Sequence, residues 1–509
     1  MTKVETLSET VEHGPGLVAR EKFYLYNYFI VAIIAIGATA SGMMTGVMST
    51  ALGQPTFLEY FHFNTASSQD TALIGAINGV YFGGAFFGSF NASYVADRWG
   101  RKTALMVTAF VATVCSGLIA GSVHIAMLLV FRTIAGWTSG AYITICCLSL
   151  SELAPPHHRG LMVALVGILN CLGYVISNWL GVAFYFVPAG GVQWRIPFAL
   201  CCVPSLIVFG SAFFVPESPR WLVMKDRHLE AAAILNKLHC RLGDEQSQDF
   251  VRLELQQIKR QIEFERNNEI SWWQMLTAKH YRRRLVLCIM TMLMAQSAGN
   301  VVIVVYGPVI YESLGFGPVA QLCLTSGYAT SGMVDNFIGS FFIDKIGRVR
   351  MMIIGIVAQL VLLAIATGLI AAYAGTTNFP AQRAVVAIFW LFMLSYGALV
   401  EGAAFTYISE IWPAHLRARG SAIGIATLYL IDMVYVEASL YAFSTIGWKF
   451  YLTFLACGTV FLFIFILLAK ETKGKPLEEI GKLFGDDLIV KTQDEMIKAE
   501  KEVFECENL

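Results

Sequence analysis

Long apolar runs alternate with short polar segments along most of the chain. A helix needs about 20 apolar residues to cross a bilayer, and twelve runs reach that length. In hydrocarbon only a helix or a closed barrel satisfies its own backbone hydrogen bonds, so the pattern predicts an all-α membrane protein with twelve transmembrane helices. The runs lie near residues 26–52, 72–96, 103–123, 124–149, 160–183, 195–215, 285–311, 319–343, 349–374, 384–408, 419–445 and 447–469.

One polar stretch, residues 216–284, is much longer than the others and separates six spans from six. Its parts 229–238 and 250–264 carry apolar residues at helical spacing, which predicts short helices lying on the membrane surface.

The composition agrees with a membrane protein. Of the 509 residues, 56% are hydrophobic and 14% are charged, whereas a soluble domain is about 25% charged. Lys+Arg and Asp+Glu both number 36, so no net basic charge would attract nucleic acid. The 11 cysteines fall mostly in apolar runs, without metal-ligand or disulfide spacing. No metal site is therefore expected, and nothing in the sequence requires a cofactor.

Basic residues are distributed unequally between the two sets of loops. The set on the side of the N-terminus is rich in Lys and Arg, whereas the opposite set holds only Arg195, Arg383 and Lys449. Because basic residues near span ends favour the cytoplasmic side, both termini are predicted to be cytoplasmic. The first 22 residues lack the pattern of a signal peptide, so the first run is expected to remain as an anchor. The predicted parts are a cytoplasmic N-terminus (1–25), a six-helix bundle (26–215), a cytoplasmic linker with short helices (216–284), a second six-helix bundle (285–469) and a cytoplasmic tail (470–509).

The two halves of the chain repeat each other's charged motifs. DRWGRK at 97–102 is echoed by DKIGR at 344–348, and SELAPPHHR at 151–159 is echoed by SEIWPAHLR at 409–417. Glu217 and Glu471 form a third pair, just after the sixth and twelfth spans. These repeats predict two parallel six-helix halves, which is the architecture of the major facilitator superfamily.

Further motifs resemble the sugar porter family of that superfamily. PESPRWL at 216–222 is similar to the segment after span six, and ETKG at 471–474 with LEEI at 477–480 is similar to the C-terminal motif. QWRIP at 193–197 is similar to fungal members. The resemblance implies alternating access, in which the two halves rock around a central site for a small-molecule solute. We expect a protein of the plasma membrane that functions as a monomer.

In that family, charged groups at the cytoplasmic helix ends form salt bridges that brace the outward-facing state. Such pairs exchange between bridged and hydrated forms at modest free-energy cost, which suits a two-state gate. In the simpler interpretation they only set the topology and anchor the helix ends. The matching residues are Asp97, Arg101, Glu152, Arg159, Asp344, Arg348, Glu410 and Arg417.

Ionisable residues inside spans are costly in lipid and are therefore functional candidates. Proton-coupled sugar porters carry an Asp in span one, and here that position is Met44, whose thioether cannot hold a proton. The partner Arg in span four is retained as Arg132. Either Arg132 reaches water and carbonyl groups, or it binds an anionic group of the substrate, or it pairs with an acid of the other half. In each case proton coupling through span one is not expected.

Four acids fall inside spans of the C-terminal half. Asp432 aligns with a family position in span eleven that is often a polar, sugar-contacting residue. Glu401 holds the first position of the family's Gly-Pro-x-Pro-Trp motif in span ten, which continues here as GAAF at 402–405, so the family's proline hinge is missing. With Asp335 and Glu437, these acids are candidates to carry protons, attract a cationic substrate or bind hydroxyl groups. The alternative is that they pair with neighbouring helices.

Amide side chains suit sugars because each offers both a donor and an acceptor. In span seven, Gln296 and Asn300 resemble the family's sugar-binding segment, in a form similar to fungal disaccharide permeases. Span five has Gly167 where the family commonly places a Gln, and Asn170 follows one turn later on the same face. Phe405 is a candidate to stack on a sugar. The alternatives are helix–helix hydrogen bonding for the amides and ordinary packing for Phe405.

Together these observations predict a secondary transporter of a small polar, sugar-like solute, acting as a facilitator because Met44 replaces the acid. The alternative is a proton-coupled or cation-selective carrier of a non-sugar metabolite that uses the four acids. A transporter-like nutrient sensor is a minor alternative, since such sensors tend to have a longer cytoplasmic tail. An enzyme is not expected. The sequence has no GxxxxGK[ST] phosphate loop, so an ATP-driven pump of the familiar type is not expected either.

Overall fold

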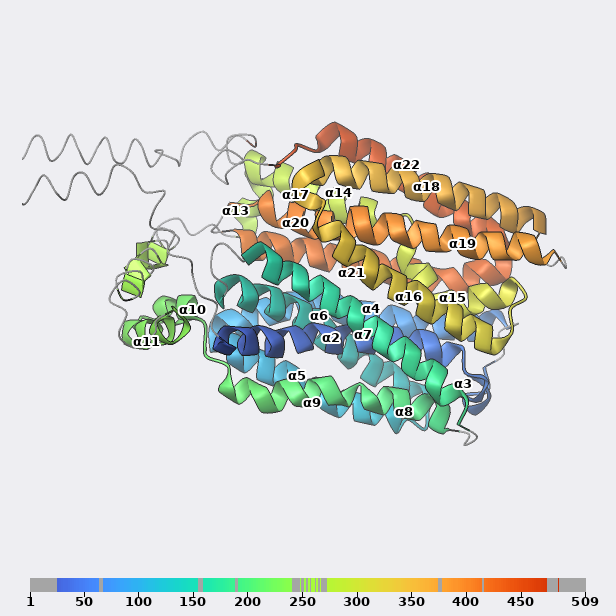
Figure 1. Cartoon of the computed structure of the whole chain (residues 1–509), viewed down its shortest axis with the longest axis horizontal. Coiled ribbons are helices and arrows are strands. Elements are labelled where there is room, and N and C mark those ends of the chain that lie inside the picture. Colours follow the sequence, from blue (N-terminus) through green and yellow to red (C-terminus); the bar gives the residue numbers. More distant parts are fainter. Residues whose placement is uncertain are drawn as a thin grey trace, which may run out of the picture.

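The computed structural model describes residues 25–473, apart from 64–66, 154–158, 188–190, 374–377, 414–415 and most of 240–271, together with Phe484. The described residues form helices joined by turns, without a strand. They make two bundles that lie side by side, the N-terminal one coloured blue to green and the C-terminal one yellow to red (Figure 1).

Each bundle contains six spans, so the prediction of an all-α, twelve-helix membrane protein is confirmed. The N-terminal spans are α2 (Leu25–Leu52), α4 (Ser68–Trp99), α5 (Arg101–Ala120), α6 (Ile125–Leu153), α7 (Arg159–Tyr185) and the pair α8 (Val192–Leu200) and α9 (Cys202–Ser211). The C-terminal spans are α14 (Lys279–Gln296) with α15 (Asn300–Ser313), α16 (Pro318–Ser340), α18 (Arg348–Tyr373), α19 (Phe379–Tyr396) with α20 (Gly402–Glu410), α21 (Arg417–Ile446) and α22 (Phe450–Leu468).

Ten helical stretches in the described part are long and apolar enough to cross a membrane. The last of them, Arg419–Leu468, contains both α21 and α22, which a 3-10 turn separates. α16 adds one more span of 23 residues. It falls outside the ten because its sequence includes polar residues, among them Gln321, Asp335 and Asn336, that are buried within the protein. The protein is therefore an integral, multi-pass membrane protein.

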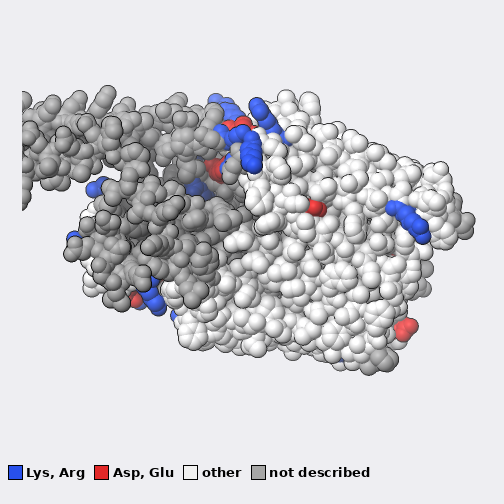
Figure 2. Space-filling view, viewed as in Figure 1, with Lys and Arg blue, Asp and Glu red and all other residues white. Residues whose placement is uncertain are grey.

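The outer surface of the bundles suits a lipid environment. On the face shown in Figure 2, charged side chains gather at the ends of the molecule, and the broad zone between them carries only an isolated acidic group. Large apolar side chains such as Phe87, Phe341 and Leu467 are more than half exposed. In water such a surface would be a costly apolar patch, whereas lipid chains solvate it.

The two halves meet along three pairs of helices. α4 packs against α21, α7 against α16, and α2 against α15. Within the N-terminal half, small residues bring helices unusually close. A Cβ at Gly136 would lie 1.9 Å from the Tyr81 carbonyl oxygen, and one at Gly84 would lie 2.1 Å from the Thr133 carbonyl oxygen. Glycine at these positions thus permits the backbone contact of α4 with α6.

The two ends of the bundle differ in charge. We call the end that holds Asp97, Arg101, Glu152, Arg348 and Glu410 the motif end, and the opposite end, which holds the short helix α3 (Pro55–Tyr60), the far end. In Figure 1 the motif end lies on the left and the far end on the right.

Two short helices extend beyond the motif end, next to the N-terminal half. They are α10 (Pro219–Met224) and α11 (His228–His239), and they share a small apolar cluster that includes Trp221, Leu222 and Ala231. The Trp221 indole nitrogen donates a hydrogen bond to the Asp97 carbonyl oxygen at 3.0 Å. This bond ties the segment after the sixth span to the end of α4. Two further short helices, α13 (Trp272–Thr277) and α17 (Ile343–Ile346), belong to the C-terminal half.

Candidate functional site

Span seven is broken near its middle, and the break places polar groups inside the protein. α14 ends at Gln296 and α15 begins at Asn300, with Gly299 between them at φ +88°. Glycine is required there because this left-handed conformation is unfavourable for residues with a Cβ. A Cβ would also approach the Phe454 ring to 2.9 Å. Broken helices of this kind form solute sites in other transporters, since their ends expose unpaired backbone groups.

Hydroxyl groups of neighbouring spans hold the side chains at the break. Gln296 Nε2 donates to the Tyr396 hydroxyl at 2.9 Å, and the Tyr328 hydroxyl donates to Asn300 Oδ1 at 2.9 Å. Gln296 and Asn300 are both buried. The two amides therefore have fixed orientations, and each retains further hydrogen-bonding capacity for a solute.

Two of the four predicted acids lie close together beside this break. Asn336 Nδ2 of α16 donates to Glu401 Oε2 at 2.5 Å. Asp432 of α21 is 4% exposed, and its charge interacts with that of Glu401. Its Oδ1 has no hydrogen-bond partner among the described residues. The structure thus forms a two-carboxylate site from the residue just before α20 and from α21, with Glu401 held in place by an amide.

Tyrosines surround this pair of acids. The phenol of Tyr396 interacts electrostatically with both Glu401 and Asp432, and those of Tyr174 and Tyr429 interact with Asp432. Tyr174 comes from α7 of the N-terminal half, whereas the other residues belong to the C-terminal half. The acidic pair therefore lies at the boundary between the halves, where an alternating-access site is expected.

Asp335 lies on α16 and packs against an irregular turn of span ten. Residues Gly397–Glu401 form a π-helix between α19 and α20, and a Cβ at Gly397 would approach Asp335 Cβ to 2.9 Å. Asp335 is 6% exposed, and its Oδ2 has no hydrogen-bond partner within the described ranges. Span ten lacks the family's prolines but carries a π-turn at the adjacent positions, a feature common at functional sites.

Span five leaves open space where the family commonly has a glutamine. No atom lies within 4 Å of a Cβ built on Gly167. Gly167 precedes Cys171 and Tyr174 by one and two turns, so it shares the face of α7 that meets the other half. Asn170 is half-buried, and its carbonyl oxygen packs against Gly42 of α2.

Arg132 lies apart from the acidic pair, inside the N-terminal half. It is 1% exposed, and its Nη1 donates to the Met44 carbonyl oxygen at 2.8 Å. Its guanidinium carbon lies 4.2 Å from the centre of the Tyr81 ring. Of the three roles considered for Arg132, the contact with a carbonyl group is the one that these distances support.

Two predicted residues are not drawn into the central cluster. Glu437 is exposed, and its backbone and Cβ pack against Gly75 and Gly79 of α4. It follows Asp432 by five residues and therefore points from a different face of α21. Phe405 is half-buried on α20, one turn beyond Glu401.

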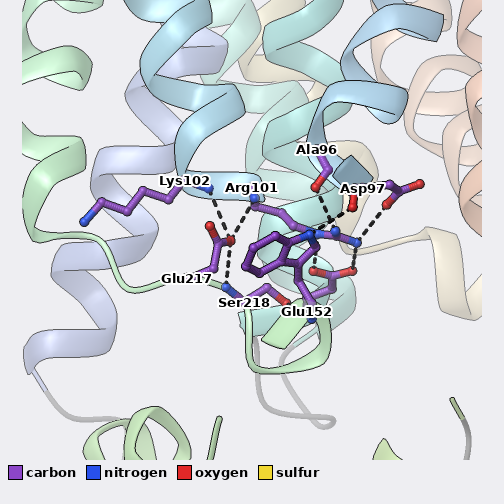
Figure 3. A network of polar contacts seen from close by, with 8 residues as sticks. Ala96, Asp97, Arg101, Lys102, Glu152, Glu217 and Ser218 are labelled. Carbon is purple, nitrogen blue, oxygen red and sulfur yellow. Dashed lines mark hydrogen bonds and ion pairs between the residues drawn. The ribbon is translucent and has the colours of Figure 1, made fainter. Parts of the chain in front are cut away.

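At the motif end, Arg101 joins two acids of the N-terminal half. Its Nε and Nη2 donate to the two oxygens of Glu152, each at 2.8 Å, and Nη2 lies 3.2 Å from Asp97 Oδ1 (Figure 3). Glu217 caps the start of α5, since its Oε1 accepts from the backbone nitrogens of Arg101 at 2.8 Å and Lys102 at 3.3 Å. A carboxylate is favourable at a helix N-terminus because the free N–H groups there carry partial positive charge.

The C-terminal half repeats this arrangement. Arg348 Nη2 donates to Glu410 Oε1 at 2.8 Å, and Glu471 accepts from the backbone nitrogen of Arg348 at 3.0 Å. Thr472 Oγ1 donates to the other oxygen of Glu410 at 2.7 Å. Arg417 is half-buried at the start of α21. The side chains of Arg159 and Asp344 lie outside the described residues.

At the far end the two halves are bonded together. Ser49 Oγ of α2 donates to the Val304 carbonyl oxygen at 3.0 Å, and the Tyr306 hydroxyl donates to the Val436 carbonyl oxygen at 2.9 Å. Asn78 Nδ2 of α4 reaches the same hydroxyl at 3.4 Å. The Ser49 and Asn78 contacts therefore join the two halves, and the Tyr306–Val436 bond ties α15 to α21 within the C-terminal half.

Sequence reasoning overlooked several residues of the site. These are polar residues within spans: Asn336, Tyr174, Tyr396 and Tyr429. The only sequence signal for them is their position, one or two helical turns from an acid or on a helix face that adjoins another span. Glu217 and Glu471 were recognised as a repeat, but their role as helix caps depends on segments more than a hundred residues away.

Comparisons with known proteins agree with this architecture. The family model described as "Sugar (and other) transporter" matches residues 30–484. The MFS-type transporter criB of Aspergillus cristatus is 30% identical over 456 residues, which cover 89% of this chain and 92% of that protein. The high-affinity glucose transporter of Kluyveromyces lactis is 28% identical over 486 residues, covering 91% and 86%. The xylose transporter XylE from E. coli, in a partially occluded inward-open conformation, shares the fold with a TM-score of 0.73, at 20% identity over 89% of this chain and all of that one.

Proposed function

This chain belongs to the sugar (and other) transporter family, and we propose that it carries a sugar-like solute down its gradient. The protein is then a secondary transporter and not an enzyme. Its solute is a small molecule with several hydroxyl groups, held at the boundary between the two halves. The observation that carries this proposal is the broken span seven, where Gln296 and Asn300 are held by tyrosine hydroxyls beside the boundary.

The residues around the break suit a polyhydroxylated ligand. Amide and phenol groups donate and accept hydrogen bonds, and carboxylate oxygens accept them strongly from hydroxyl groups. The solute would contact Gln296, Asn300, Glu401 and Asp432, with Asn170 and Phe405 at its edge. The open position at Gly167 leaves room on the N-terminal side.

Transport proceeds by rocking of the two halves about this site. Closure at the far end depends on the bonds of Ser49 with Val304 and of Asn78 with Tyr306, and closure at the motif end on the groups around Arg101 and Arg348. Asp97 and Arg419, from opposite halves, interact electrostatically at that end. We place the motif end and both termini in the cytoplasm, the protein in the plasma membrane, and the functional unit as a monomer.

We favour facilitated diffusion because span one has no proton-carrying group next to Arg132. The Met44 side chain is a thioether, and Arg132 takes the Met44 carbonyl oxygen as a partner. Proton coupling at that site would require an acid that is alternately protonated and ionised, and span one supplies none there.

A second candidate function is coupling to a proton or selection of a cationic solute. It is favoured by the two acids Glu401 and Asp432, whose charges interact without a basic group among their described partners. A protonated amine would neutralise them and would be stabilised by the neighbouring phenol rings.

Uptake into proteoliposomes distinguishes these functions. A panel of labelled hexoses, pentoses, polyols and amines is tested with and without a protonophore and an imposed pH gradient. We expect uptake of a sugar or polyol that equilibrates at the outside concentration and does not respond to the protonophore. Accumulation driven by the pH gradient would replace the facilitator by a symporter, and uptake confined to amines would replace the sugar-like solute by a cation.

Variants at the acidic pair test the location of the site. Asp432→Asn and Glu401→Gln should each change the apparent KM or rate, with folding shown intact by a monodisperse gel-filtration peak. Glu312→Gln, at an exposed far-end position, is the matched control and should leave transport unchanged. Normal transport by both Asp432→Asn and Glu401→Gln would exclude this pair as the site.

A further inference from the structure

Arg132 retains two hydrogen-bond donors that no protein group satisfies. Nη1 donates to the Met44 carbonyl oxygen, but Nε and Nη2 have no partner among the described residues. The side chain is 1% exposed and lies two turns after the start of α6, a membrane span. A buried donor without an acceptor destabilises the folded protein, and the cost is greater when the group is charged.

The charge of Arg132 also has no acidic group among the described residues with which it interacts electrostatically. The groups with which it interacts electrostatically are Tyr81, Tyr174 and Cys201, which are a pair of phenols and a thiol. The Tyr81 ring gives some compensation, since its face lies 4.2 Å from the guanidinium carbon. An aromatic face and one carbonyl dipole stabilise a cation less than an anion does, because neither carries a full negative charge.

A small cavity adjoins the guanidinium. It measures about 10 Å³, and about 10–15 Å³ is enough for one water-sized occupant. Arg132, Met44 and Ser116 line it, with apolar groups from Val47, Ile119, Ala135, Phe198 and Cys201. These residues come from α2, α5, α6, α8 and the turn before α9, so the cavity lies within the N-terminal half.

We propose that this cavity binds a small monovalent anion, chloride under physiological conditions, which neutralises Arg132. A single negative charge matches the single positive charge, and a halide accepts hydrogen bonds from Nε and Nη2 together. Phosphate, sulfate and carboxylates are too large for the cavity. Water would satisfy the donors but would leave the positive charge of Arg132 uncompensated inside a membrane span. The unbranched, flexible Met44 side chain can shift to admit an ion slightly larger than water.

Met44 occupies the position at which the resemblance to proton-coupled relatives expects an aspartate. Its side chain lines the same cavity, and its sulfur lies 3.6 Å from Thr138 Oγ1. A carboxylate at this position would reach into the space assigned to the anion. The bound anion thus takes the electrostatic role of an acid that this chain lacks, and it remains in place during transport as a structural ion.

Thermal unfolding of the purified protein in detergent tests this proposal independently of transport. The melting temperature is measured in sodium chloride, sodium bromide and sodium gluconate at equal ionic strength. We expect chloride and bromide to raise it saturably above the gluconate value, since an ion that binds only the folded state stabilises it by mass action. A matching anomalous peak next to Arg132 in a bromide-soaked crystal would locate the ion.

Two variants assign the effect to this cavity. Met44→Asp supplies an internal carboxylate, so its melting temperature should no longer depend on the halide. Arg132→Met removes the charge and should abolish the halide dependence as well. If the wild-type protein melts at the same temperature in all three salts, the cavity holds water only and the proposal is wrong. An undiminished halide effect in Met44→Asp would also overturn it, because the ion would then bind elsewhere.

Discussion

Arg101 of α5 and Glu152 of α6 form a two-pronged ion pair at the motif end. Nε and Nη2 of the arginine each lie 2.8 Å from a different oxygen of the carboxylate. Both side chains are more than nine-tenths buried, whereas the equivalent pair of the C-terminal half, Arg348 and Glu410, is 12% and 22% exposed. The two halves therefore share a motif but not the degree to which its charges are shielded from water.

This difference predicts unequal effects of removing the acid. Breaking a buried ion pair leaves an uncompensated charge and costs about 3–5 kcal/mol, and the cost falls as water reaches the site. We expect Glu152→Ala to lower the melting temperature in detergent clearly more than Glu410→Ala does. A larger loss for Glu410→Ala would show that burial does not control the strength of these pairs.

Substitution of Gly100 or Gly347, at the starts of α5 and α18, should destabilise the protein. They have φ angles of +100° and +103°, and a Cβ at Gly100 would lie 2.2 Å from Oε2 of the capping residue Glu217. This backbone conformation is nearly exclusive to glycine and costs other residues about 1–3 kcal/mol. Gly100→Ala and Gly347→Ala should therefore lower the melting temperature. Gly210→Ala is the control, since no atom lies near its Cβ position; a similar loss there would contradict the explanation.

Gln296 should affect transport, whereas a second buried glutamine should not. Gln296→Leu removes the donor to Tyr396 and a group assigned to the solute, so the apparent KM should rise roughly tenfold, the effect of about 1.4 kcal/mol. The control is Gln359→Leu in α18. Uptake kinetics in proteoliposomes compare the two variants, and an equal effect of both would remove Gln296 from the proposed site.

Gln359 allows a separate prediction about stability. Its side chain is fully buried, and neither Nε2 nor Oε1 has a hydrogen-bond partner in the described structure. Replacing such a group with an apolar one of similar shape is nearly neutral or stabilising. The melting temperature of Gln359→Leu should equal or exceed that of the wild type, and a marked decrease would reveal a partner for the amide.

The far-end contacts should control how often the site opens toward that end. Tyr306→Phe removes the hydroxyl that accepts from Asn78 of the other half, and Ser49→Ala removes the bond to the Val304 carbonyl oxygen. Each bond contributes about 1 kcal/mol, so each variant should raise the open-to-closed ratio roughly fivefold. Spin labels at Glu59 and Glu312, in a cysteine-depleted background, measure the distance across this end. An unchanged distance distribution would show that these bonds do not hold it closed.

Hydrophobic patterning predicted the spans well because the bilayer requires it. The run predicted near 26–52 became Leu25–Leu52, and the one near 349–374 became Arg348–Tyr373. The breaks inside spans were harder to foresee. The prolines missing from span ten raised doubt about a hinge there, yet the helix is irregular at Gly397–Glu401 through a π-turn that no proline marks.

The sequence by itself determined the number of spans, the two repeated halves, the charged motif end and the identity of the buried charges. Each of these depends on spacing along one helix or on repetition along the chain, and both can be read locally. Only the tertiary structure decided which groups meet: Asn336 with Glu401, Gln296 with Tyr396, and Arg132 with the Met44 carbonyl oxygen. These partners lie 65, 100 and 88 positions apart. Their contact depends on how each helix is rotated about its axis, and among all-apolar neighbours the sequence pattern specifies that rotation weakly.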